Sequence, residues 1–176
     1  VELSDTHTLS VVFDEYVPYA LWCEKKDSET CLFLDVTGFA FAHAPTLQGN
    51  ALVRYVEDGK VPQPDTTAFD ADFINTTRAF IDLLKDQLDL YVTHVSKAGK
   101  YDIEYTISGG GILKISQTMS MEDSFANLKT ILNSDEFKNI SPGSFQYIDL
   151  RFGDKIFVNE HKATTTQDTT TATSSN

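Results

Sequence analysis

The residues that could do chemistry in this chain are four histidines, two cysteines and 26 acidic side chains. A nucleophilic triad needs a Ser, Cys or Thr beside a histidine that a carboxylate orients. No histidine lies in a recognisable local signature of that kind, and no G-x-S-x-G motif occurs. His43, between Ala42 and Ala44, is expected to be the partly buried histidine and to have a structural role. The sequence therefore predicts no enzyme, no catalytic residue and no cofactor.

Two further patterns could suggest a bound ligand. The run Gly109–Gly111 lacks the Lys-Ser/Thr pair of a phosphate loop and precedes a strand pattern, so it predicts a hairpin turn. Asp65, Asp70 and Asp72 lack the spacing of a calcium-binding EF-hand, and the last two are expected to complement a helix N-terminus. No metal site is predicted. A secreted hydrolase that uses two carboxylates is one possible function of such an acidic chain, although no spacing in the sequence singles out a pair of carboxylates.

The two cysteines, Cys23 and Cys31, lie in two β-like runs joined by the polar linker Glu24–Thr30. If these runs form a hairpin, the cysteines face each other at a distance that permits a disulfide. Two buried free thiols are the alternative. The spacing is not that of a C-x-x-C redox motif, and no further Cys or His pair completes a zinc site. A disulfide would place the domain outside the cytoplasm.

The composition predicts one globular domain with a substantial core. The chain has 176 residues, of which 41% are hydrophobic, and its net charge is −12. This acidic balance argues against a nucleic-acid partner and against binding to an anionic membrane surface. No apolar run reaches the roughly 20 residues of a membrane span. The chain begins with Val1 and shows no signal peptide, so it is expected to be a fragment or a processed form.

Apolar periodicity predicts strands in the first half of the chain, a helix, further strands and a second helix. The helices are expected around Phe73–Leu88 and over Met121–Leu132, with capping boxes at Thr67 with Asp70 and at Ser120 with Asp123. The sequence therefore predicts an α+β fold with a mostly antiparallel sheet, two helices packed on one face and a disordered C-terminal tail. The expected strands are Thr8–Tyr16, Tyr19–Cys23, Cys31–Asp35, Phe39–Ala42, Ala51–Glu57, Leu90–Val95, Tyr101–Ile107 and Ile112–Ser116.

The stretch Phe145–Val158 predicts a closing hairpin that turns at Gly153-Asp154. Alternation places Gln146, Ile148, Leu150 and Phe152 on the expected core face, and Phe145, Tyr147, Asp149 and Arg151 on the outer face. Phe157 is a candidate exposed anchor. Only a polar tail follows the last strand, so this strand could leave a free edge, which is either a docking surface or an aggregation hazard.

The closing hairpin resembles a motif of the bacterial division proteins FtsQ/DivIB. In this family the last motif combines aspartate, a hydrophobic residue, arginine, an aromatic residue, a turn and a final strand, as in Tyr147–Val158. Glu15–Trp22 is similar to the junction between the family's POTRA domain and its β-domain. Phe33–Pro45 resembles a hairpin of the family, and Tyr101–Ile115 with the helix Met121–Leu132 follows in the same order.

The resemblance implies that residues 1–18 end a POTRA-like domain, residues 19–160 form the β-domain and residues 161–176 form a disordered Thr/Ser-rich tail. It implies a non-enzymatic divisome scaffold of a single-pass cell-membrane protein, with this domain extracytoplasmic at the division site and the transmembrane helix absent from this chain. Its last strand would accept a strand from a partner of the FtsB/DivIC type, which itself pairs with FtsL. The implied docking residues are Arg151, Phe152, Lys155, Ile156, Phe157, Val158 and Asn159. The alternative is a secreted or surface-anchored binding module with the tail as a stalk.

Overall fold

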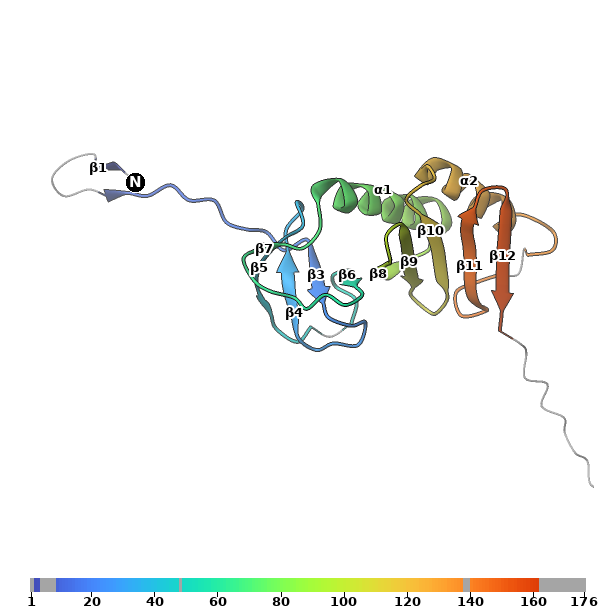
Figure 1. Ribbon diagram of the computed structural model, residues 1–176, viewed down its shortest axis with the longest axis horizontal. Helices are drawn as coiled ribbons and strands as arrows, with labels where there is room; N and C mark the ends of the chain where they lie inside the picture. The colour runs from blue at the N-terminus through green and yellow to red at the C-terminus, as the bar shows by residue number, and fades with distance from the viewer. Residues whose placement is uncertain (1, 4–8, 48, 138–139, 162–176) are drawn as a thin grey trace, which may run out of the picture.

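Two helices lie side by side on one face of a ten-stranded sheet, as Figure 1 shows for the computed structural model. The structure describes residues 2–3, 9–47, 49–137 and 140–161, so the tail predicted to be disordered lies outside the described residues from residue 162 onward. The helices are α1 (Ala71–Leu88) and α2 (Met121–Leu132). The described part confirms the predicted α+β fold with a mostly antiparallel sheet.

The sheet has the strand order β12-β11-β10-β9-β8-β6-β3-β4-β5-β7. Three of its pairings are parallel, those of β3 with β6, β6 with β8 and β10 with β11, and the others are antiparallel. A separate two-stranded hairpin, β1 with β2, lies away from the sheet in Figure 1. The strands are β1 (Glu2–Leu3), β2 (Leu9–Ser10), β3 (Ala20–Cys23), β4 (Cys31–Leu34), β5 (Phe39–Ala44), β6 (Arg54–Glu57), β7 (Thr66–Thr67), β8 (Val92–Ala98), β9 (Asp102–Ile107), β10 (Ile112–Ser116), β11 (Phe145–Phe152) and β12 (Lys155–Glu160).

The parallel pairings explain why both helices cover the same face. A parallel neighbour requires a crossover connection, and here α1 crosses from β6 to β8 while α2 crosses from β10 to β11. The strands β6, β8 and β10 run in the same direction, and both crossovers move one place toward β12. Since such connections are right-handed as a rule, two crossovers with the same direction and the same shift place their helices on one face.

The main core lies between the sheet and this helix layer. Phe80 and Leu84 of α1 and Leu128 of α2 are fully buried, and they meet the sheet side chains Tyr105 and Ile148 in one hydrophobic cluster. A smaller cluster lies on the opposite face of the sheet, where Leu21, Cys23, Cys31 and Val56 are covered partly by Leu47 and Leu52. The sheet is therefore covered on both faces near β3 and β4.

Both helices begin at a side-chain cap. Asp70 accepts a hydrogen bond from the Phe73 N–H at 2.7 Å, and Ser120 accepts one from the Asp123 N–H at 3.0 Å. The predicted cap at Ser120 is confirmed. The predicted capping role of Thr67 is wrong, because Thr67 pairs with Phe39 in the short strand β7 and the helix starts after Asp70.

The predicted strand Thr8–Tyr16 is wrong for most of its length. Of its described residues, only Leu9–Ser10 form a strand, which pairs with Glu2–Leu3. Val12 and Phe13 are exposed, and no strand among the described residues pairs with residues 11–18. Its apolar residues have the pattern of a strand, but pairing requires a neighbour with free backbone groups.

Candidate partner-binding edge

The closing hairpin forms one edge of the sheet. Strand β12 pairs with β11 on one side, and among the described residues no strand pairs with it on the other. Figure 1 shows β12 as the outermost strand of the sheet, at the end of the molecule opposite to β1. Gly153 occupies the turn with φ +67°, in the left-handed region that glycine adopts at little cost. The structure therefore places Lys155–Asn159 of the predicted docking residues on this outermost strand, and Arg151 and Phe152 on its neighbour β11.

Two β-bulges in β11 change which side chains face the core. The pairing with β12 shifts between Phe145 and Tyr147 and again between Asp149 and Phe152, and each shift inserts one extra residue in β11. Ile148 and Leu150 face the core as predicted. Phe152, however, is 53% exposed, Gln146 is exposed and Phe145 is only 2% exposed, so the faces predicted for these three residues are wrong. An extra residue reverses the alternation on the far side of each bulge, because side chains alternate with a period of two.

One hydrogen bond shows which residues of β12 turn their backbone N–H and C=O groups toward β11. The His161 N–H donates to the Ser144 carbonyl oxygen at 3.1 Å, so residue 161 turns its backbone groups toward β11. Both bulges lie in β11, and backbone groups in the regular strand β12 point alternately to its two sides. Asn159 and Phe157 therefore face β11, while Ile156, Val158 and Glu160 turn their N–H and C=O groups outward. These outward groups are the hydrogen-bonding capacity of the free edge.

The side chains of β12 alternate between the two faces of the sheet. Ile156 and Val158 are half-buried and pack against the main core below the helix layer. Phe157 projects to the open face, which is the face of the sheet opposite the helices. There it is 52% exposed and its ring meets the Phe152 ring edge to face at a centroid distance of 5.6 Å. Lys155 is exposed near the turn, and Asn159 donates a hydrogen bond to the Gln146 side chain at 3.1 Å. The edge thus carries an exposed aromatic pair beside free backbone groups.

Arg151 is held by two carboxylates of the same chain. Its Nε and Nη2 atoms donate to the two carboxylate oxygens of Asp149 at 2.9 and 2.6 Å, and Nη1 donates to Asp102 on β9. Burial acts to raise the pKa of Asp149, but hydrogen bonds from Arg151 outweigh it and hold that pKa below its usual value. Arg151 therefore fixes the end of β11 that leads into the turn, and it lies beside the exposed ring of Phe152.

Asn127 of α2 is a residue at this edge that the sequence did not indicate. Its Nδ2 atom donates to the Gly153 carbonyl oxygen at 2.9 Å, which ties the hairpin turn to the helix. The helical period of the apolar residues defines only the core-facing stripe of α2, and Asn127 lies beside this stripe. No local motif marks such a contact, since its partners are 26 residues apart.

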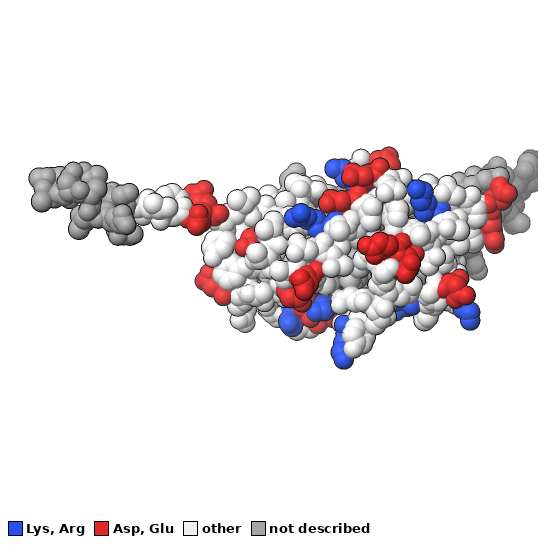
Figure 2. Space-filling view, turned by 90° about the horizontal axis from the view of Figure 1, so that it is seen from above, with Lys and Arg blue, Asp and Glu red and all other residues white. Residues whose placement is uncertain are grey.

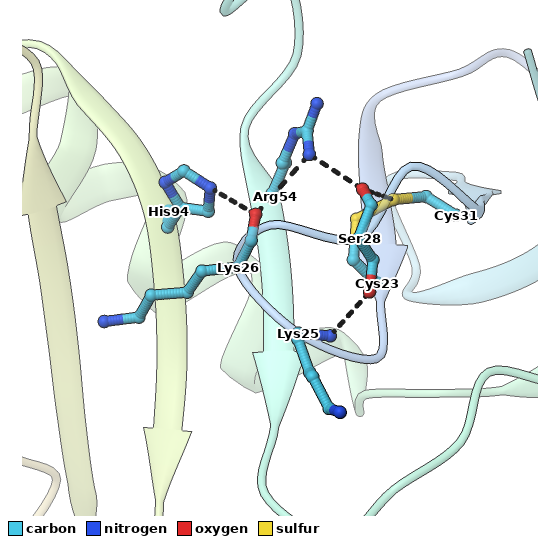
Figure 3. The surroundings of a disulfide bond; sticks show 7 residues. All are labelled: Cys23, Lys25, Lys26, Ser28, Cys31, Arg54 and His94. Carbon is cyan, nitrogen blue, oxygen red and sulfur yellow. Dashed lines mark hydrogen bonds between the residues drawn. A yellow bond between two sulfur atoms is a disulfide. The ribbon is translucent and has the colours of Figure 1, made fainter. Parts of the chain in front are cut away.

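Cys23 and Cys31 form a disulfide across the β3–β4 hairpin, where they occupy opposed positions. Figure 3 shows the loop that the disulfide closes and its two further anchors. The Arg54 guanidinium donates to the Ser28 carbonyl oxygen at 3.0 Å, and His94 Nε2 lies 3.0 Å from the Lys26 carbonyl oxygen. The loop is thus fastened to β6 and β8.

The other residues considered for chemistry have structural surroundings. His43 is exposed on β5, so the prediction that it is partly buried is wrong, and the half-buried histidine is His94. The residues Gly109–Gly111 all have positive φ in the turn after β9, as predicted for a hairpin turn. Asp70 and Asp72 lie at the first turn of α1. In the described ranges no three His, Cys, Asp or Glu side chains are grouped to hold a metal ion.

The surface charge is mixed on the helix-covered face. Figure 2 shows Lys and Arg side chains scattered among acidic side chains on this face, with no continuous basic patch. The mixture of signs on this face is in keeping with a chain whose net charge is −12. In the part of the chain that the structure describes, neither helix has the length and apolar character needed to cross a membrane.

Comparisons with protein-family models and with curated proteins find no match to this chain.

Proposed function

We propose that this chain is the extracytoplasmic β-domain of a bacterial division scaffold of the FtsQ/DivIB type. It binds a partner of the FtsB/DivIC type, and through that partner FtsL, by adding the partner's strand to β12. The domain has no catalytic role in this proposal, and its membrane anchorage depends on a transmembrane helix outside this chain. A disulfide such as Cys23–Cys31 is compatible with an extracytoplasmic location.

The observation that supports this proposal best is the free outer edge of β12, directly after the motif Asp149–Phe152 and the turn. The residues that carry the family resemblance thus belong to the hairpin that ends at an open edge. Two sets of contacts hold this hairpin in place before any partner arrives. They are the hydrogen bonds of Arg151 to Asp149 and Asp102, here called the Arg151 clamp, and the bond from Asn127 to the Gly153 carbonyl oxygen. Preorganisation of this kind reduces the ordering that binding would otherwise require.

Strand addition would use the backbone of Ile156, Val158 and Glu160. Each new main-chain hydrogen bond contributes about 0.5–1.5 kcal/mol net, so these bonds alone give modest affinity. The exposed rings of Phe157 and Phe152 add apolar contact area on the open face. Backbone pairing would thereby fix the geometry, and the aromatic pair would contribute specificity.

A proline at Val158 tests this proposal. The Val158→Pro variant removes one outward N–H and leaves the bonds to β11 in place, so the Kd for the extracytoplasmic region of the FtsB/DivIC-type protein should rise about tenfold or more. Val158→Thr is the matched control, since it keeps the N–H and nearly the same shape, and it should bind within about threefold of the wild type. Binding can be measured by calorimetry after circular dichroism has verified folding. An unchanged Kd for a folded Val158→Pro protein would refute strand addition at β12.

A further inference from the structure

A hollow lies between the free edge of β12 and the helix α2. Asn127, Thr130 and Ile131 line it from the helix, and Asp154, Lys155, Ile156 and Phe157 line it from the hairpin, around a volume of about 590 Å³. Of these hairpin residues, Ile156 is the one whose side chain packs against the main core. Ile131 and Ile156 are both half-buried and pack against the main core, so the floor of the hollow between them is apolar.

The geometry of a sheet decides which side chains of an added strand would enter this hollow. Neighbouring residues on adjacent strands project to the same face of the sheet. Ile156 and Val158 project toward the helix layer, so the residues of an added strand beside them also project toward α2. The residue beside Phe157 projects to the open face. Every second side chain of the added strand would therefore face the helix layer, and the one beside Ile156 would lie nearest Ile131.

We propose that α2 forms the second wall of the docking site and that Ile131 selects strands with aliphatic side chains at alternate positions. This inference rests on the proposed strand addition at β12, and it adds a specificity-determining residue that lies outside the closing hairpin. The occupant is an extended segment of another protein. A serine in place of a valine at the positions facing α2 would lose apolar contact area with Ile131 and Ile156.

Charge favours a segment with basic residues at both ends. Asp154 lies at the turn and Glu160 at the other end of β12, both are exposed, and neither has an ion-pair partner among the described residues. Lys155 is the one cation of this strand, and the whole chain carries a net charge of −12. Lysine at each end of the added strand would complement these carboxylates. The same net charge opposes pairing of β12 with a second copy of this chain.

Two synthetic peptides test the role of Ile131. Both carry lysine at each end and threonine at every second internal position. One has valine at the remaining positions and the other has serine. We expect wild-type protein to bind the valine peptide about tenfold more tightly, and Ile131→Ala to reduce this ratio to about threefold or less.

Leu132→Ala is the matched control. Leu132 is also half-buried and packs against the same core, but it lines a different hollow, with Leu88 and Phe145. Leu132→Ala should therefore lose similar stability and keep the wild-type ratio. Equal ratios for wild type and Ile131→Ala, equal effects of the two variants, or no binding of either peptide would overturn the inference. A dimer in sedimentation experiments that Val158→Pro abolishes would assign the edge to a second copy and also overturn it.

The two proposals can fail separately. If the valine peptide binds with the predicted dependence on Ile131 but the FtsB/DivIC-type protein does not bind, the divisome assignment fails. The proposal that Ile131 and the hollow select an added strand is then still supported. If that protein binds with a Kd that Val158→Pro raises and Ile131→Ala leaves unchanged, strand addition stands and the role of α2 fails.

Discussion

Arg151 reaches Asp102 across the intervening strand β10. Asp102 pairs with Ser116 at the end of β10, and Lys114, two residues before Ser116, pairs with Asp149, two residues before Arg151. Strands two places apart are separated by about 10 Å, which a long side chain can span only if the residue between is small. Ser116 meets this condition, and its hydroxyl group bonds to Thr118. Three strands are thus joined near the turn of the closing hairpin.

Loss of the Arg151 side chain should loosen this end of the sheet. Arg151→Met leaves the carboxylate of Asp149, whose side chain is only 8% exposed, without its paired donor. We expect the free energy of unfolding to fall by about 2 kcal/mol, the cost of leaving a buried charged acceptor unpaired. Urea denaturation at neutral pH measures this change.

Arg151→Lys separates charge from geometry. A lysine keeps the positive charge but cannot form the two parallel bonds to Asp149, so its unfolding free energy should lie between those of Arg151→Met and the wild type. If both variants unfold at the wild-type urea concentration, the clamp does not contribute to stability. In that case Arg151 would be available to a partner at no cost to the fold.

Most of the fold could be predicted from the periodicity of apolar residues. The helix Met121–Leu132 and the strand Ile112–Ser116 have the predicted bounds, because their buried faces repeat regularly. The segment Thr8–Tyr16 has an equally strong pattern but only two residues of it are in a strand. Alternation of apolar residues indicates which segments can form a strand. Strand formation also requires a neighbouring strand with which the backbone can pair.

The candidate site was predicted less completely, for two physical reasons. The bulges in β11 shift the alternation, and nothing in the local sequence marks an extra residue, so Phe152 and Phe145 were assigned to the wrong faces. Long-range contacts such as Asn127 with Gly153 depend on how α2 crosses the sheet. The last strand was located correctly along the chain, since turn residues and alternation are local signals.

Removal of the disulfide should lower stability without unfolding the domain. Cys23 and Cys31 are eight positions apart, and cross-linking a loop of this size stabilises a protein by about 2–3 kcal/mol. The double variant Cys23→Ala/Cys31→Ala should therefore melt roughly 5–10 °C below the wild type. Thermal unfolding by circular dichroism measures this shift.

A reducing agent supplies the control for this prediction. Dithiothreitol should lower the melting temperature of the wild type by a similar amount and leave the double variant unchanged. Thiol titration of denatured, unreduced wild-type protein should find no free thiol. Two free thiols per chain, or equal melting temperatures for wild type and variant, would contradict the role of the disulfide in holding the loop.

Stability should decrease on acidification because of His94. Burial is the largest effect on His94 and lowers its pKa below 6.5, helped by the charges of Arg54 and Lys26, while the Lys26 carbonyl oxygen acts in the opposite direction. The unfolded chain therefore takes up a proton at this residue at a higher pH than the folded chain does. The stabilisation is fully present above about pH 6.5 and is lost as the pH falls through the lower pKa of the folded state.

His94→Gln tests this dependence, because glutamine can donate to the Lys26 carbonyl oxygen but does not titrate. Between pH 6.5 and 5, the unfolding free energy of the wild type should fall more steeply than that of the variant, as measured by urea denaturation at several pH values. An NMR titration of the His94 ring should give a midpoint below 6.5. Parallel pH profiles for the two proteins would show that folding does not change the proton affinity of His94. A midpoint above 6.5 would show that the folded state favours the protonated ring. His94 would then hold the disulfide loop more firmly at low pH, since a protonated ring can donate to Lys26 and to Thr93 at the same time.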